Sequence, residues 1–188
     1  MKVLKYGFIL IGTLFMVLVA IGIFKRDFES KASVTIEAPA AQVFAVYNNP
    51  LLLNHWVAEF HSIENISGSL NELGSQWQMN YQSTEGTPIK MQHTLTSYIA
   101  NQQVGYDYAN EWLTGKTLVS FEATDNGTTS VSMVQQYSGK GIVQNAILFL
   151  IQGSIEEVNQ SNLEQLKKLI ESTHPDKLED EDEDELEL

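Results

Sequence analysis

An unbroken apolar run near the amino terminus is the feature that most constrains this chain. Residues 6–24 have the sequence YGFILIGTLFMVLVAIGIF, nineteen residues without a charged side chain. A helix of that length is about 28 Å long, close to the ~30 Å hydrocarbon core of a bilayer. Lys2 and Lys5 precede the run, and Lys25 and Arg26 follow it. The run therefore predicts one amino-terminal transmembrane helix, with residues 1–31 as the anchor and its flanks.

A cleaved signal peptide is the alternative interpretation of the same run. The two lysines give a positive start, and Ala20-Ile21-Gly22 places small residues where cleavage before Ile23 would occur. The run exceeds the roughly 7 to 15 apolar residues of a signal peptide and continues past that site, which favours the anchor. Basic residues on both sides leave the orientation in the membrane open.

Charge is distributed unevenly along the 188 residues. The formal net charge is −13, to which residues 175–188 contribute −8 and residues 1–31 contribute +3. The stretch DKLEDEDEDELEL repels itself and has little apolar content, so residues 175–188 are predicted to be a disordered acidic tail. Its role, a solvated extension or a contact for a basic partner, stays open. So negative a chain is not expected to bind nucleic acid, whose phosphates need clustered basic side chains.

Residues 32–174 have the pattern of one α+β domain. Residues 33–38 alternate with period two and predict a strand, and Pro39 then opens a short helix. The stretch LLLNHW predicts a second short helix that ends at Trp56. Polar and apolar residues then alternate through six further strands, as far as Tyr137. Such alternation is typical of an antiparallel sheet with one covered face and one wet face.

One long helix, from Ile142 to Ser172, closes the domain. Its second half is amphipathic, whereas its first half contains AILFLI and is apolar almost all round. Gly153 divides the halves, although glycine is unfavourable by about 1 kcal/mol relative to alanine inside a helix. The glycine therefore indicates either a kink or a close approach to the sheet.

This order of elements resembles the SRPBCC superfamily, which includes START lipid-transfer domains, polyketide cyclases and the birch pollen allergen. The stretch VTIEAPAAQVFAVYNNPLLLNHW is similar to the opening strand, Ala-Pro helix start, Val-Phe pair and tryptophan of that superfamily. Glu72-Leu73-Gly74, Gly127-Thr128-Thr129 and the leucine-rich last helix extend the resemblance over residues 32–172. The resemblance implies a helix-grip fold, in which a seven-stranded antiparallel sheet wraps the last helix around a cavity for a hydrophobic ligand.

The inward rows of the expected sheet, together with Phe149 of the last helix, supply the candidate ligand-binding residues. These rows are rich in tyrosine and methionine and contain one histidine, whereas a purely structural core more often uses leucine, isoleucine and valine. Under the implied fold the rows line the cavity. The candidate ligand-binding residues are Trp77, Met79, Tyr81, Met91, His93, Leu95, Tyr106, Tyr108, Phe121, Met133, Tyr137 and Phe149.

Catalytic chemistry has little support in the sequence. The chain has no cysteine, and its four histidines lack the spacing of metal ligands, so neither a metal site nor a cofactor is predicted. His93 alone lies on the expected inner face and is a weak catalytic candidate, with a hydrogen-bonded core histidine as the plainer interpretation. Arg26 is the only arginine, so the domain has no guanidinium to hold a carboxylate or phosphate in a bidentate pair.

The sequence thus favours a membrane-tethered protein that binds a small hydrophobic ligand, lipid or isoprenoid-like, over an enzyme. About eight residues separate the span from the first expected strand, a reach of at most ~28 Å, so the cavity would stay near the bilayer. One alternative is an enzyme of the polyketide cyclase or dehydratase type that uses His93. Another is a protein-interaction module with a solid core. The ligand's identity and the oligomeric state stay open.

Overall fold

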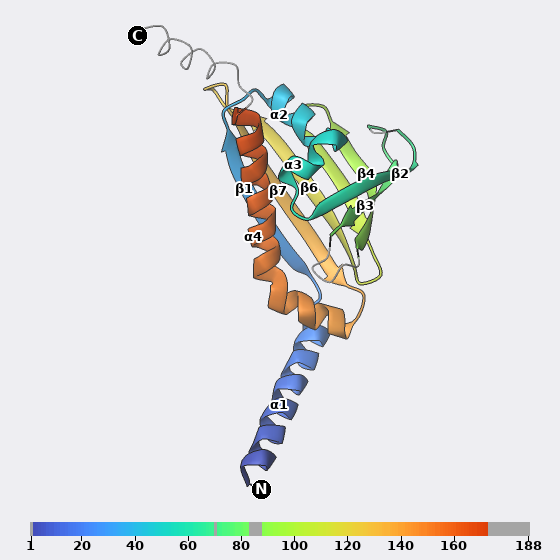
Figure 1. Cartoon of the computed structure of the whole chain (residues 1–188), viewed down its shortest axis with the longest axis vertical. Coiled ribbons are helices and arrows are strands. Elements are labelled where there is room, and N and C mark those ends of the chain that lie inside the picture. Colours follow the sequence, from blue (N-terminus) through green and yellow to red (C-terminus); the bar gives the residue numbers. More distant parts are fainter. Residues whose placement is uncertain (1, 70, 83–87, 173–188) are drawn as a thin grey trace, which may run out of the picture.

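A seven-stranded sheet, one long helix and one projecting amino-terminal helix make up the fold (Figure 1). The computed structural model describes residues 2–69, 71–82 and 88–172, so the predicted acidic tail lies outside the described residues. The helices are α1 (Lys2–Phe24), α2 (Ala40–Tyr47), α3 (Leu53–Trp56) and α4 (Ile142–Ser172), with a 3-10 turn at Pro50–Leu52. The strands are β1 (Phe28–Ile36), β2 (Phe60–Ser67), β3 (Gln76–Tyr81), β4 (Ile89–Ile99), β5 (Gln103–Ala109), β6 (Leu113–Ala123) and β7 (Thr129–Gly139).

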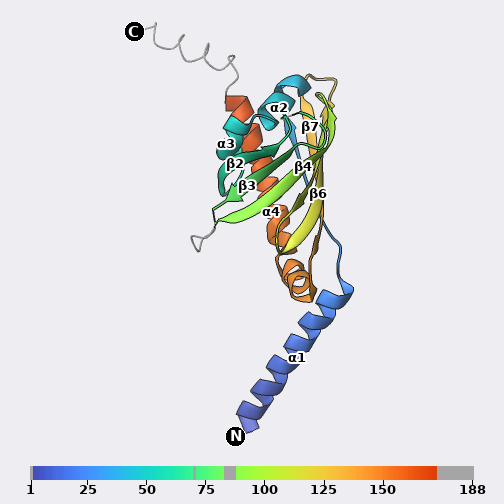
Figure 2. The ribbon, with the colours of Figure 1, turned by 90° about the vertical axis from the view of Figure 1, so that its right-hand side faces the viewer.

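The sheet has the strand order β1-β7-β6-β5-β4-β3-β2, and every neighbouring pair is antiparallel. Six strands follow one another as a meander, while β1 pairs with the last strand and forms the edge opposite β2. The sheet curves around α4, and α2 and α3 lie at the end of the molecule remote from α1 (Figure 2). The helix-grip fold expected from the sequence is confirmed.

The core lies between the inner face of the sheet and the second half of α4. Leu163, Leu166 and Ile170 recur at i, i+3 and i+7, so they form one apolar stripe, and each is almost fully buried. The stripe packs against inward residues of the sheet such as Val119 and Val131, which are completely buried. This packing fixes α4 against the strands whose side chains surround the site described below.

The first strand begins five residues earlier than the sequence predicted. β1 starts at Phe28 rather than Ser33, so residues 28–31 belong to the sheet and only residues 25–27 separate it from α1. The period-two pattern is present there, because Phe28, Ser30 and Ala32 are buried. The pattern is hard to recognise in the sequence, because two of the inward residues, Ser30 and Ala32, are small and only weakly apolar or polar, while the outward positions Glu29 and Lys31 are charged.

The predicted kink of α4 is visible in the fold. The first part of the helix lies across the end of α1, and the rest turns to run along the sheet (Figure 1). A Cβ atom on Gly153 would meet no heavy atom within 4 Å, so close approach to the sheet does not explain this glycine. Its position in a bent helix agrees with the kink.

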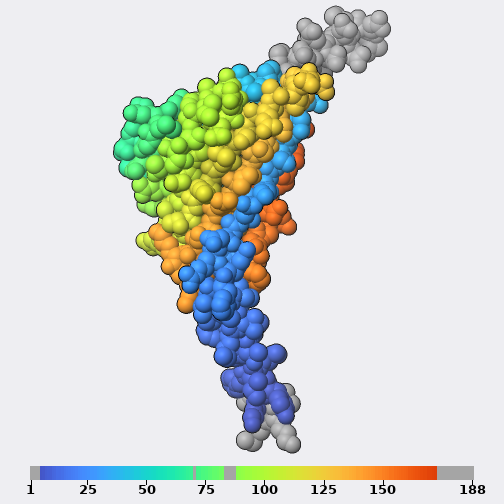
Figure 3. All heavy atoms as spheres, turned by 180° about the vertical axis from the view of Figure 1, so that it is seen from behind, coloured from blue at the N-terminus to red at the C-terminus, as the bar shows by residue number. Residues whose placement is uncertain are grey.

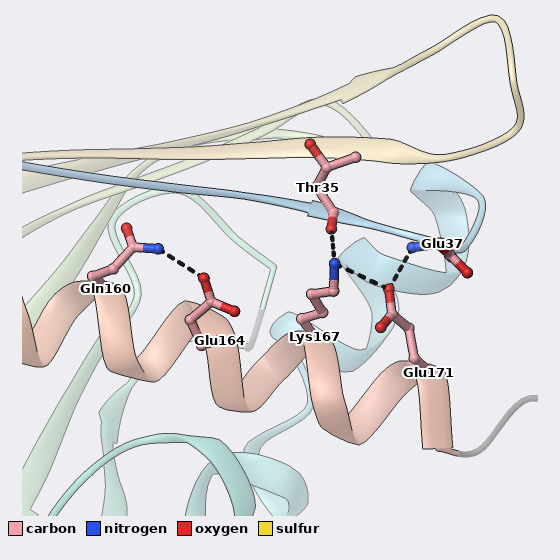
Figure 4. Close-up of polar contacts among 6 residues, drawn as sticks. All are labelled: Thr35, Glu37, Gln160, Glu164, Lys167 and Glu171. Carbon is pink, nitrogen blue, oxygen red and sulfur yellow. Dashed lines mark hydrogen bonds and ion pairs between the residues drawn. The ribbon is translucent and has the colours of Figure 1, made fainter.

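Polar side chains of α4 cover the exposed edge of the sheet (Figure 4). An edge strand presents backbone N–H and C=O groups that have no partner strand. Along β1, side chains of α4 bind these groups. The Gln160 amide accepts a hydrogen bond from the Ser33 N–H and donates one to the Ser33 C=O. Lys167 donates to the Thr35 C=O, and Glu171 accepts from the Glu37 N–H just after the strand. The helix therefore binds the sheet through its flank as well as through its apolar stripe.

The helix α1 projects away from the domain (Figures 1 and 3). By length and composition, its segment Lys5–Phe24 is able to cross a membrane. At the end of this segment Gly22 packs against Ile142, and the Asn145 side-chain amide donates a hydrogen bond to the Gly22 carbonyl at 3.3 Å. The domain therefore contacts α1 directly and is connected to it by residues 25–27.

Candidate functional site

A cavity of about 180 Å³ lies between the inner face of the sheet, the α2–α3 segment and the middle of α4. Ligand pockets commonly measure ~300–1,000 Å³, so this cavity is small. An apolar cavity of roughly 150 Å³ is nevertheless large enough for benzene. Its lining residues are Tyr47, Asn48, Pro50, Leu53, Trp56, Val57, Ile63, Asn71, Trp77, Met79, Tyr81, His93, Leu95, Val104, Tyr106, Thr117, Met133, Gln135, Asn159 and Asn162.

The sheet brings seven of the candidate ligand-binding residues together at this cavity. The register explains part of this, because Trp77 on β3 lies directly opposite His93 on β4. Leu95 and Tyr106 are likewise direct partners, on β4 and β5. The seven candidates that line the cavity are Trp77, Met79, Tyr81, His93, Leu95, Tyr106 and Met133.

The other five candidates lie in packed regions outside the cavity wall. Phe121 belongs to the main core, where its ring meets Phe44 and Tyr47 edge to face. The remaining four gather near the start of β1 and the first part of α4, in a second apolar cluster with Phe28 and Leu148. They are Met91, Tyr108, Tyr137 and Phe149.

Gly115 allows this second cluster to pack closely beside the cavity. It lies on β6 between Tyr108 on β5 and Tyr137 on β7, as the direct partner of both. A Cβ atom on Gly115 would collide with the ring and hydroxyl of Tyr108, so that side chain occupies the space that the glycine leaves. Tyr108 in turn lies opposite His93 and holds one side of its ring.

His93 is the most unusual group in the cavity wall. Its side chain is only 5% exposed, stacks on Trp77 with ring centroids 5.6 Å apart, and meets the edge of Tyr106. Neither ring nitrogen has a hydrogen-bond partner among the described residues. Burial lowers the pKa of His93 to about 4, so the ring is neutral at pH 7. The plainer interpretation, a hydrogen-bonded core histidine, does not describe this side chain.

Two further polar groups of the wall share this property. The Thr117 hydroxyl and the Trp56 indole N–H are buried and have no hydrogen-bond partner in the described part of the chain. A buried polar group without a partner destabilises the folded protein by about 1–3 kcal/mol. Three residues that carry such groups therefore line this one cavity.

Tyrosine hydroxyls form a second polar feature of the wall. The hydroxyls of Tyr47 and Tyr106 are 2.9 Å apart and hydrogen-bond to each other, so one of them remains able to donate into the cavity. Burial raises the pKa of both phenols above the usual 10, so they stay protonated at pH 7. They can act as hydrogen-bonding groups but not as bases.

The described residues that line the cavity include no Asp, Glu, Lys or Arg. Its side-chain amides are partly engaged in the protein itself: Asn159 donates to Gln135 and Ser30, and Asn162 accepts from the Ala58 N–H. Within residues 2–69, 71–82 and 88–172, no three His, Asp or Glu side chains are placed to hold a metal ion. The wall is therefore electrically neutral, and it suits a neutral ligand.

Sequence reasoning missed the contributions of the helices to this wall. Asn159 and Asn162 are polar residues beside the apolar stripe of α4, and the amphipathic pattern places such residues outside. Asn159 and Asn162 are three residues apart and lie on the side of α4 next to Leu163 of the apolar stripe. That spacing is the sequence signal that could have revealed them. The sequence placed Trp56 at the end of a short helix and in the family resemblance but not in the cavity wall, because a single tryptophan at a helix end has no periodicity.

A larger hollow of about 840 Å³ opens on the other side of the sheet, whose outer face is seen in Figure 3. Its lining includes charged side chains of both signs, among them Glu29, Asp107 and Lys116. This hollow is more open than the neutral cavity, and its charges are mixed. The neutral cavity is the better candidate for a specific small-molecule site.

Comparisons with known proteins agree with this architecture. No curated protein sequence matches the chain. Among solved structures, protein SA2116 of unknown function from Staphylococcus aureus is 12% identical, with a TM-score of 0.65 over 80% of this chain and 98% of that one. Ara h 8.0201 is 17% identical (TM-score 0.63; 78% and 99% covered). The di-domain ARO/CYC protein StfQ from the steffimycin biosynthetic pathway is 8% identical (TM-score 0.64; 79% and 52% covered).

These similarities show the fold. Together with the family model given below, they bear out the SRPBCC resemblance. Sequence comparison defines the family more closely. The family model described as "Activator of Hsp90 ATPase homolog 1-like protein" matches residues 37–171, which include the α2–α3 segment, strands β2 to β7 and nearly all of α4, and the chain therefore belongs to that family.

Proposed function

We propose that this protein binds a small, neutral and largely apolar molecule that carries at least one hydrogen-bonding group. The observation that carries the proposal is the set of three buried, unpartnered polar groups, on His93, Thr117 and Trp56, in the wall of a cavity without charged side chains. Such walls give affinity through apolar contact and orientation through a few polar groups.

The cavity size limits the part of the ligand that is enclosed. A volume of about 180 Å³ accepts one aromatic ring or a short branched chain, judged against the roughly 150 Å³ that suffices for benzene. The lipid or isoprenoid-like ligand suggested by the sequence would therefore place only one ring-sized portion inside. A longer chain would require the wall between α3 and β3 to open.

We also propose that α1 tethers the cavity to a membrane. The support is a 20-residue apolar helix, Lys5–Phe24, joined to β1 by residues 25–27. Mass spectrometry of the mature protein tests this, because the tether requires an intact amino terminus. A mature chain that starts at Ile23 would show that the segment is a signal peptide.

The binding proposal is tested with the full chain purified in mild detergent. Co-purifying molecules are extracted and identified by mass spectrometry, and neutral ring-sized alcohols and ketones are titrated while calorimetry records binding. We expect saturable binding of neutral compounds and none of charged counterparts such as benzoate. Absence of both a co-purified molecule and any saturable binding would contradict the proposal.

A pair of matched variants identifies the site. Thr117→Val removes an unpartnered hydroxyl at constant shape, so it should weaken ligand binding severalfold without lowering stability. Thr129→Val removes an equally buried hydroxyl that donates to the Ala38 carbonyl at 2.6 Å. That control should lower stability and leave the ligand affinity unchanged, since Thr129 does not line the cavity.

A cyclase or dehydratase activity is the second candidate function. Its support is the neutral, unpartnered His93 beside the phenol of Tyr106, a base and a hydrogen-bonding group in one cavity, together with the structural similarity to StfQ. If the cavity catalyses a reaction, His93→Gln should abolish turnover while the melting temperature stays close to that of the wild type. The remaining alternative, an interaction module with a solid core, agrees less well with a cavity of about 180 Å³.

A further inference from the structure

The first part of α4 exposes a continuous apolar face. Val143, Ile147, Leu150 and Ile151 follow the spacing i, i+4, i+7 and i+8, which places them on one side of the helix. Val143 and Leu150 are each 62% exposed, far more than apolar residues of a helix that packs on a sheet. No described element covers this face, although the opposite side buries Asn145, Ala146 and Leu148.

This apolar face begins beside the apolar surface of α1. Ile142 lies against Gly22, in the last turn of α1, and Asn145 donates to the Gly22 carbonyl. The apolar surface of α1 and the exposed face of α4 are therefore neighbours in space. If α1 crosses a bilayer, the start of α4 lies at the depth where that helix leaves the hydrocarbon.

The direction of the helix fits the same position. The first part of α4 lies across the end of α1, so it runs roughly in the plane of a bilayer that α1 crosses (Figure 1). The rest of α4 turns away to run along the sheet (Figure 1). Glu156 and Glu157, later in the same helix, occupy exposed positions. Apolar residues thus occur where the helix would touch lipid, and acidic residues occur where it leaves the surface.

Basic residues lie at the same end of the domain. Lys25 and Arg26 follow α1 directly, and Lys140 precedes α4 by two residues; all three are exposed. Asp27 is the acidic residue among them. Basic side chains beside an apolar helical face are typical of helices that lie in the headgroup region of a membrane.

We propose that residues 142–151 of α4 form an interfacial helix that inserts its apolar face into the surface of the same bilayer that α1 crosses. The proposal rests on the tether proposed above. Two contacts with the membrane, a span and an in-plane helix, then fix the orientation of the domain, which a flexible tether alone would not do.

The absence of cysteine from the chain allows a direct test. Single-cysteine variants Val143→Cys and Leu150→Cys carry an environment-sensitive fluorophore in the full chain. Val158→Cys is the matched control, because Val158 is an exposed residue (47%) of the same helix beyond the turn. Leu14→Cys in α1 reports the span itself. Each protein is reconstituted into vesicles of phosphatidylcholine with a minor fraction of phosphatidylglycerol, and melting curves confirm folding.

We expect fluorophores at 143 and 150 to be quenched by lipids spin-labelled near the headgroup and protected from a water-soluble quencher. The label at 158 should show the opposite behaviour, and the label at 14 should be quenched by lipids spin-labelled deep in the acyl chain. If labels at 143 and 150 are as accessible to water as the label at 158, the interfacial helix is wrong while the tether stands.

Two other results would also overturn the proposal. Protection from the aqueous quencher without quenching by lipid would show that protein, such as a second copy of the chain, covers the face. A label at 14 that is not quenched by lipid would show that the tether itself fails, and the interfacial helix would fail with it. Ligand binding, measured separately, distinguishes both results from failure of the cavity proposal.

Discussion

His93 shows how one side chain can be well packed and still lack what its chemistry requires. Three aromatic rings, those of Trp77, Tyr106 and Tyr108, surround it and exclude water. The Tyr106 hydroxyl is hydrogen-bonded to that of Tyr47. The histidine therefore stays neutral, and its lone pair and N–H have no hydrogen-bond partner in the described part of the chain.

The burial of His93 predicts a distinct pH dependence of stability. Its pKa falls from 6.5 to about 4 on folding, so the unfolded chain binds the proton more readily than the folded one. The free energy of unfolding should be unaffected above pH 6.5 and fall progressively between pH 6.5 and 4, by about 3 kcal/mol from this group. Urea unfolding of the full chain in detergent at pH 7, 5.5 and 4.5 measures this.

The matched controls for this prediction are two histidine variants. His93→Phe should lose the His93 part of the pH dependence, because phenylalanine does not titrate. His61→Phe, at an exposed position of β2, should retain it. Parallel pH profiles for the wild type and His93→Phe would contradict the assignment.

Among the elements, α4 has three different surfaces along its length. Its first part exposes an apolar face, its middle contributes amides to the cavity, and its second half combines an apolar stripe with polar flanks that hold β1. The edge contacts protect the sheet as well as stabilise it, since a free edge strand is a template for pairing with another chain.

Gln160→Ala tests the role of these edge contacts. The substitution leaves the N–H and C=O of Ser33 to water, which should lower the free energy of unfolding by about 1 kcal/mol because both hydrogen bonds are solvent-exposed. It should also increase self-association, measured by sedimentation velocity. Lys168→Ala, at an exposed position in the same helix, is the control and should change neither quantity. Equal behaviour of the two variants would contradict the protective role.

Gly153→Ala tests the cause of the bend in α4. A methyl group fits there, because no heavy atom lies within 4 Å of the Cβ position. If the bend does not need glycine, alanine should raise the free energy of unfolding by up to about 1 kcal/mol through helix propensity. Thermal and urea unfolding measure the change, with Ser154→Ala as a neighbouring exposed control. A decrease for Gly153→Ala alone would show that the bend depends on the glycine.

The sequence predicted the elements better than it predicted the site. The bounds of α4 and the inward rows of β3 to β7 follow from periodicity, because helix and strand repeats are local properties. Alternation predicts which face of the sheet a residue lies on, but not whether that part of the face lines the cavity. His93 and Met91 share a row, yet His93 lines the cavity and Met91 packs in the second cluster. Whether an inward residue lines the cavity or packs in a cluster depends on which part of α4 lies opposite it, and that is a tertiary property.

The helix α1 and the domain form one connected arrangement. Only residues 25–27 join α1 to β1, instead of the eight residues expected, and a direct contact between α1 and α4 supports this short connection. The contact depends on Gly22, the residue that also completes the small-residue pattern of a cleavage site. Its packing against Ile142 gives this glycine a structural role that requires the intact amino-terminal segment.

Gly22→Val should disturb this arrangement without unfolding the domain. A Cβ atom on Gly22 would collide with the backbone carbonyl of Ile142, which cannot move aside as a flexible side chain could. The junction should therefore open and the angle between α1 and the domain should vary more widely. The core residues that stabilise the domain lie elsewhere, so its melting temperature should stay close to that of the wild type.

Pulsed electron resonance measures this effect as the spread of distances between spin labels at Ile11→Cys in α1 and Val158→Cys in α4, both exposed positions. Gly12→Val is the matched control, because the same substitution in the same helix meets no heavy atom within 4 Å. We expect a broad distribution for Gly22→Val and a narrow one for Gly12→Val and the wild type. A narrow distribution in all three proteins would mean that the connection through residues 25–27, rather than the helix contact, sets the orientation of the domain.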